Sequence, residues 1–241
     1  MKPRPCSWTT RTARRSFRDS GGRLSSPAVP GGPRLAVYVE AGPTRRVACS
    51  IEWPGWSRVA GTEDDALRAL AAYAPRYATV AARAGLTLPE SFDLEVVERV
   101  TGTGDTDLGA PDRILDGDAR ALDAGERERL MSLMLASWEA FDETVAHTPA
   151  QLESGPPDAR DRDVMVDHVF DAETAYAREL GAQVTQPHVG DAAAIASLRA
   201  AITKACRSTD ASGAWPVRYF IRRDIWHALD HMWEMEDRSA P

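Results

Sequence analysis

Cysteine is scarce in this chain of 241 residues. The three cysteines, Cys6, Cys49 and Cys206, are odd in number and far apart, and no pair has CxxC spacing. Neither a disulfide framework nor a thiolate metal site is therefore indicated. The chain also lacks an apolar run of about 18 residues, the length that a membrane-spanning helix requires. These absences predict a cytoplasmic protein with no membrane partner.

Acidic residues are almost missing from the first 46 positions, which hold ten Lys or Arg and two Asp or Glu. The net charge of the whole chain is −7, so the first 46 residues contribute +8 and the remainder carries −15. A body this acidic is a poor surface for a nucleic acid duplex, because phosphate contacts need clustered cations. We therefore expect no nucleic acid partner for this acidic body, and nucleic acid binding through the basic residues 1–33 stays open as a third possibility.

Large apolar residues are rare in residues 1–33, which are rich in Arg and Ser. The apolar core of a secretory signal is absent, and the composition superficially resembles that of a transit peptide. Such a segment cannot bury enough apolar surface to offset its ordering entropy. The sequence predicts a disordered basic tail over 1–33.

After the tail, three short segments rich in β-branched residues predict strands, at positions 34–42, 45–53 and 56–61. Thr62 is a suitable N-cap for a helix that ends at Gly85 and is kinked or broken at Pro75. A further strand is expected over 91–100. Together these elements predict a small α+β domain over residues 34–110.

The segment 101–112 contains four Gly or Pro residues and reads as a linker or loop. It lacks the lysine of a P-loop and precedes no clear change from strand to helix, so a phosphate-binding role is not indicated.

The remainder of the chain has helical periodicity. Apolar residues recur every three or four positions along 124–147 and form one stripe, at Leu130, Met134, Trp138, Phe141 and Val145. Similar patterns predict three more helices, over about 161–181, 191–206 and 216–237. Four helices with short or medium connections predict an all-α, up-down-up-down four-helix bundle over residues 115–238. The expected fold class is therefore a small α+β domain followed by this bundle.

Two histidines four residues apart stand in the last predicted helix, in the run WHALDHMWEMEDR at 226–238. On an ideal helix His227 and His231 lie one turn apart, border the apolar stripe and share a face with Glu234. His168 lies in the middle of the apolar face of helix 161–181. Three neutral ring nitrogens could converge inside the bundle and leave a coordination position open, the arrangement of a catalytic metal site.

The geometry of an ideal helix leaves a second interpretation open, in which the histidines are hydrogen-bonded residues of the core. Glu234 is the candidate fourth ligand or general base. Asp171 and Asp224, each one turn from a histidine, would orient the imidazole rings, although solvated helix positions explain them equally well. Trp226 and Trp233 lie on another side of the last helix, where we expect them to pack against another element.

The segment DVMVDHVFDAETAYARELG (163–181) resembles the second helix of the DinB/YfiT-like superfamily, and RRDIWHALDHMWEMEDR (222–238) resembles its fourth helix. Proteins of this superfamily are four-helix bundles that bind a divalent metal. The resemblance covers about 125–238 and implies metal ligands at His168, His227 and His231.

Several members of the superfamily resemble transferases or isomerases that use mycothiol or bacillithiol. The resemblance therefore implies a divalent-metal-dependent enzyme, a thiol S-transferase or isomerase. It would bind zinc or nickel and act on a small-molecule electrophile and a thiol. A homodimer is also implied.

The segment 37–77 is similar to the HicB-type pattern of a β-hairpin, a Pro-Gly turn and a helix. In toxin–antitoxin pairs such a domain binds a protein partner, but no DNA-binding segment is evident in this chain. The alternative hypothesis is therefore a non-catalytic metal-holding or protein-binding module that acts through its N-terminal α+β domain.

Overall fold

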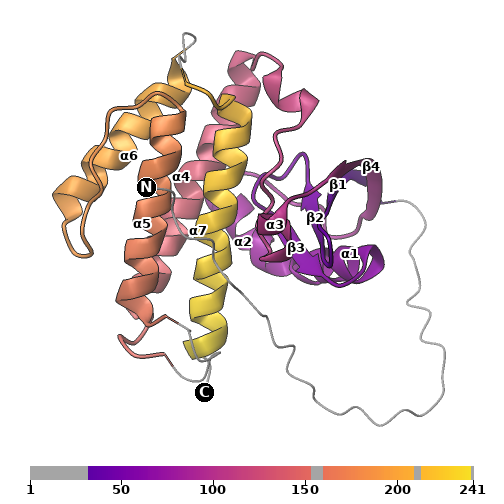
Figure 1. Cartoon of the computed structure of the whole chain (residues 1–241), viewed down its shortest axis with the longest axis horizontal. Coiled ribbons are helices and arrows are strands. Elements are labelled where there is room, and N and C mark those ends of the chain that lie inside the picture. Colours follow the sequence, from indigo (N-terminus) through magenta and orange to yellow (C-terminus); the bar gives the residue numbers. More distant parts are fainter. Residues whose placement is uncertain (1–31, 153–159, 209–212, 240–241) are drawn as a thin grey trace.

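The computed structural model describes residues 32–152, 160–208 and 213–239, so nearly all of the tail predicted over 1–33 lies outside the described residues. The first part of the chain forms a sheet with two helices, β1 (Arg34–Ala41), β2 (Arg46–Ser50), β3 (Ser57–Ala60), α1 (Glu63–Ala72), α2 (Ala74–Arg83) and β4 (Asp93–Thr101). These six elements are called the sheet unit below. The second part is helical, with α3 (Gly104–Asp107), the 3-10 helix η1 (Asp116–Ala119), α4 (Ala124–His147), α5 (Arg162–Glu179), α6 (Ala192–Arg207) and α7 (Val217–Ser239). The prediction of an α+β part followed by a helical part is confirmed (Figure 1).

The four strands form one sheet in the order β3-β2-β1-β4. β1 pairs antiparallel with β2 and parallel with β4, and β2 pairs antiparallel with β3. Alternate side chains of β1 pack on opposite faces of the sheet. Val37 and Val39 belong to the main hydrophobic core, while Tyr38 packs with Val47 and Cys49 in a second, smaller one. β1 is therefore buried on both faces, which explains why it reads as a nearly continuous apolar run.

The signals that predicted the first helices are confirmed. The Thr62 side chain accepts a hydrogen bond from the backbone N–H of Asp65 at the start of α1. The helix predicted over 63–85 is broken at Tyr73, and Pro75 lies in the first turn of α2, where its missing N–H costs nothing. Gly85 follows α2 with a positive φ of 71°, as expected of a helix stop.

The segment 101–112, expected to be a linker or loop, is attached to the sheet. It contains α3, and the Asp107 carboxylate accepts hydrogen bonds from the backbone N–H groups of Thr44 and Arg45 at 3.0 and 2.9 Å. The buried carboxylate of Glu40 in β1 accepts another from the backbone N–H of Asp112 at 3.1 Å. Two acidic side chains therefore tie the segment to the sheet.

The sheet unit packs directly on α7. The cluster of buried apolar side chains is continuous from the sheet unit into α4, α5 and α7. Gly55 has a positive φ of 82°, and a Cβ atom there would collide with the side chain of Ile225. The turn between β2 and β3 therefore needs glycine both for its backbone conformation and for its close approach to α7.

Arg58 of β3 joins the sheet unit to α7. Its guanidinium lies 3.6 Å from the centre of the Tyr73 ring and 4.1 Å from that of Trp233, and it donates to Asp230 at 3.0 Å. Trp233 and Trp226 are both buried. The prediction that the tryptophans pack against another element is confirmed for Trp233, which contacts Arg58 and Tyr73.

Figure 1 shows the four long helices α4, α5, α6 and α7 side by side, with the sheet unit against one side of them. α7 packs against both α4 and α5, and it runs in the direction opposite to α5 (Figure 1). Within the described parts of the chain, none of the helices has both the length and the apolar character that a membrane crossing requires.

We predict that Arg58→Ala lowers the free energy of unfolding by about 2 kcal/mol, because it removes a desolvated cation from between two aromatic rings. Urea denaturation of the full chain measures this change. The control is Arg68→Ala, which removes an exposed arginine paired with Asp65 on the surface of α1 and should leave stability almost unchanged. Equal effects of the two substitutions would contradict the role given to Arg58.

Candidate metal centre

Helices α5 and α7 bring three histidine side chains together. His168 comes from α5, and His227 and His231 lie one turn apart on α7. The Nε2 atom of His227 lies 3.2 Å from Nε2 of His168 and 3.2 Å from Nε2 of His231. Each ring offers one nitrogen, and the three nitrogens all lie within 4.8 Å of one another, so they could hold one metal ion.

The spacing of these nitrogens fits a metal ion. A tetrahedral zinc ion binds histidine nitrogen at about 2.05 Å, which places two such nitrogens about 3.3 Å apart. The two Nε2 separations of 3.2 Å are close to this value. Three converging imidazoles are also a donor set that zinc, nickel and other divalent metals accept. The residues present therefore fit the metal that the sequence resemblance implies.

Burial keeps the three rings neutral. It lowers the pKa of His168 to about 3 and that of His231 to about 4, and it holds the pKa of His227 well below its usual range. His227 and His231 are only 4% and 2% exposed, whereas His168 is half-buried. At neutral pH each ring is therefore unprotonated at one nitrogen, which is the form that binds a metal.

Glu234 lies on the outer side of the His231 ring. Its Oε2 is 3.3 Å from Nδ1 of His231, and its Oε1 accepts a hydrogen bond from Arg238 at 3.0 Å. Burial raises the pKa of this carboxyl to about 7. Because Nδ1 is the nitrogen that faces away from the cluster, Glu234 is placed to orient His231. Its role as a fourth ligand or general base stays a prediction.

The two aspartates expected to orient the rings have different surroundings. Asp224 is 1% exposed, and its Oδ2 accepts a hydrogen bond from Nε1 of Trp138 at 2.9 Å. No hydrogen bond joins Asp224 to a histidine in the described residues. Asp171 is exposed, and its charge raises the pKa of His168, in opposition to the larger effect of burial.

Sequence reasoning missed a further buried acid, Glu173 of α5, which is 1% exposed. The nearest cation is Arg199 of α6, whose Nη2 lies 3.9 Å from Oε1 of Glu173. A signal was present in the sequence, since Glu173 continues the apolar stripe of Val166, Val169 and Phe170 at helical spacing. A charged residue on the buried face of a helix is a candidate functional residue.

The thiols of Cys49 and Cys206 are not reactive groups. Both are free and buried, and burial raises the pKa of each to about 12. A thiol of this kind forms almost no thiolate at neutral pH.

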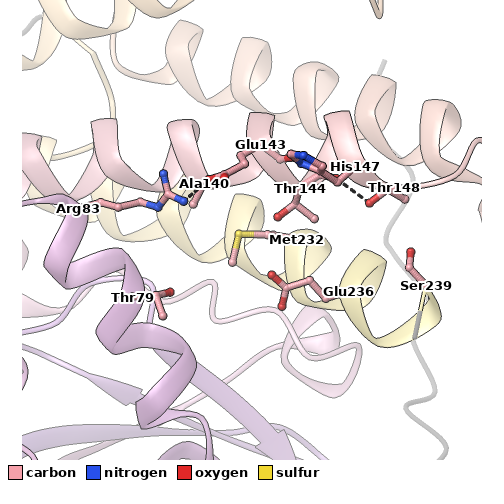
Figure 2. Close-up of a pocket in the computed structure, with 10 residues that line it drawn as sticks. All are labelled: Thr79, Arg83, Ala140, Glu143, Thr144, His147, Thr148, Met232, Glu236 and Ser239. Atoms are coloured by element: carbon pink, nitrogen blue, oxygen red, sulfur yellow. Dashed lines mark hydrogen bonds and ion pairs between the residues drawn. The ribbon is translucent and has the colours of Figure 1, made fainter. Parts of the chain in front are cut away.

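A separate pocket of about 370 Å³ lies where α2, α4 and α7 meet (Figure 2). Its lining includes the Arg83–Glu143 ion pair, His147, Met232 and Glu236. The three clustered histidines are not part of this lining. The pocket and the histidine cluster are therefore distinct features of the molecule.

Comparison with known proteins finds no match for this chain among protein-family models, curated proteins or solved structures. The geometry of the histidine cluster is therefore what supports a function.

We predict that the buried histidines make the metal-free protein lose stability as the pH falls from about 6.5 toward 4, and this effect is measured as the difference between the wild type and His231→Gln, because the raised pKa of Glu234 acts in the opposite direction. The unfolded chain binds protons at its histidines near their ordinary pKa of 6.5, whereas the buried rings of the folded chain stay neutral until about pH 4 or below. Urea denaturation at several pH values measures this loss. His231→Gln removes one of these groups, so its stability should depend less steeply on pH. Identical slopes for both proteins would contradict the prediction.

Proposed function

We propose that this chain is a divalent-metal-dependent enzyme of the DinB-like type, acting as a thiol S-transferase or isomerase. The observation that carries the proposal is the convergence of three neutral Nε2 atoms from α5 and α7. The proposal includes an up-down-up-down four-helix bundle formed by α4, α5, α6 and α7. Their side-by-side arrangement supports it (Figure 1).

A zinc or nickel ion held by the three rings would supply Lewis acidity, which lowers the pKa of a bound thiol to near neutral pH. His227 and His231 are fixed by burial, and Glu234 together with Arg238 holds the outer nitrogen of His231. His168 is the least buried of the three histidines, so the thiol and the electrophile would approach from the α5 side.

Aromatic side chains beside His227 suggest where a small-molecule electrophile would lie. The Tyr176 ring is 6.0 Å from the His227 ring and 5.2 Å from the Trp215 ring, and both aromatic residues are partly exposed. Partly exposed rings next to a metal site supply apolar contact area without closing the approach. Mycothiol or bacillithiol is the thiol that we propose, and a homodimer is the proposed assembly.

A non-catalytic metal-holding or protein-binding module is the second candidate. The low exposure of His227 and His231 favours it, because structural metal sites are closed to solvent. In that case the HicB-like sheet unit would recruit a protein partner. The two candidates differ in whether a thiol reaches the metal.

Thiol transfer to a chlorodinitrobenzene tests the enzyme. In this reaction the thiolate sulfur forms a bond to the ring carbon, chloride leaves and the thiol proton passes to solvent. We predict that the zinc-loaded chain accelerates the reaction of mycothiol or bacillithiol, and that His227→Ala slows it about 100-fold or more. The control is His147→Ala, which removes an exposed histidine outside the cluster.

A second measurement distinguishes the enzyme from the non-catalytic module. With cobalt in place of zinc, thiol binding at the metal adds a sulfur-to-cobalt absorption band. A protein that holds cobalt but shows neither this band nor thiol transfer would be a metal-holding module, and the enzyme proposal would fail.

A further inference from the structure

The pocket between α2, α4 and α7 combines buried apolar residues with exposed charged ones (Figure 2). Met232 and Ala140 are only 3% and 6% exposed, whereas Arg83, Glu143 and Glu236 are exposed. The volume of about 370 Å³ lies within the range of small-molecule sites, and such sites often lie between structural units. The pocket between the sheet unit and the long helices therefore has the size and the position of a site for a small organic molecule.

The C-terminal ends of three helices line this pocket. α2 contributes its last residue, Arg83, and α4 contributes Thr144 and His147 from its last turn. α7 contributes Glu236 and its last residue, Ser239. The C-terminal end of a helix carries a partial negative charge, because the peptide dipoles align and the last carbonyl groups have no partner within the helix. Three such ends around one pocket favour a cationic ligand.

The hydrogen-bond donors of the lining are largely used within the protein. The hydroxyl groups of Thr79 and Thr148 each donate to a backbone carbonyl of the preceding turn, both at 2.7 Å. Nδ1 of His147 lies 2.7 Å from the backbone carbonyl oxygen of Glu143. Because a carbonyl only accepts, Nδ1 carries the proton, and Nε2 of the neutral ring is left as an acceptor. The lining therefore offers a ligand mostly acceptors.

The carboxylates at the pocket outnumber the guanidinium groups that neutralise them. Arg83 pairs with Glu143, while Arg76 is shared between Glu236 and Asp237 at 2.7 and 2.8 Å. Three carboxylates and two guanidinium groups leave an excess of one negative charge. A carboxylate has two oxygens and accepts several donors, so its pairing with arginine still leaves positions for an N–H group of a ligand.

One hydroxyl group of the lining lacks a partner. The Oγ atom of Ser239 is buried, and no residue in the described parts of the chain forms a hydrogen bond with it. Burial of an unpartnered polar group is unfavourable, so a donor that reaches this oxygen stabilises the protein on binding. This observation is independent of the charges and also indicates a ligand that donates hydrogen bonds.

We propose that this pocket binds an aliphatic diamine or polyamine, whose ammonium groups donate to Glu143 and Glu236 while its methylene chain packs on Met232 and Ala140. An ammonium group has three donors and no acceptor, which complements the lining. Two carboxylates on different helices, together with buried apolar residues, match a ligand with two cationic ends and an apolar middle. The lining contains none of the three clustered histidines, so this site does not depend on the proposed function.

Calorimetric titration of the full chain with 1,4-diaminobutane tests the proposal. We expect saturable binding of this diamine, and no binding of 1,4-butanediol, which has the same carbon chain without the charges. Glu236→Gln should weaken the binding about 10-fold, because it removes an ionised acceptor. The matched control is Glu139→Gln, which removes an exposed carboxylate of α4 outside the pocket and should keep the wild-type affinity.

A steric variant distinguishes this pocket from the general attraction of a diamine to an acidic protein. Thr79→Trp introduces a large ring at an exposed position of α2 in the lining, leaves the charge unchanged and should abolish binding. The proposal is overturned if the wild type shows no saturable binding of the diamine. It is also overturned if Thr79→Trp binds like the wild type, or if Glu139→Gln and Glu236→Gln weaken the binding equally.

Discussion

The burial of α7 on several sides is the constraint on which the rest of this structure depends. One side of the helix meets the sheet unit through Ile225, Trp226 and Trp233, while other sides pack on α4 and α5. A helix held in this way can neither rotate nor slide without opening the core. The positions of His227 and His231 against α5 therefore follow from packing contacts far from the rings, including those of Arg58 and Gly55.

Much of this arrangement could be predicted from local sequence signals, because periodicity, caps and breakers act over a few residues. The range 124–147, the Thr62 cap and the break before Pro75 are such cases. The long-range attachments could not be predicted, since Glu40 and Asp107 find their partners across tens of residues. Local composition alone made the segment that they hold look like a linker.

The sequence predicted which three histidines form the cluster, but it did not predict how deeply each of them is buried. The helical wheel places His168 in the middle of the apolar face of helix 161–181, yet His168 is half-buried and Val164, one turn before it, is 56% exposed. The buried face of α5 is centred on Met165 and Val169, and it extends to a buried acid, Glu173. The spacing of apolar residues predicts the buried face of a helix only approximately. It does not indicate which acidic residue on that helix is buried. The contacts of α5 with α7 and with Arg199 of α6 decide this.

The central claim is that the three histidines hold one metal ion, and metal content tests it most directly. Plasma mass spectrometry would be applied to protein purified without a histidine tag and dialysed against zinc or nickel. The account predicts about one equivalent per chain, lost in His231→Ala and kept in His188→Ala, which removes an exposed histidine. The absence of metal from the wild type, or equal metal in wild type and His231→Ala, would contradict the claim and leave the histidines as packing residues.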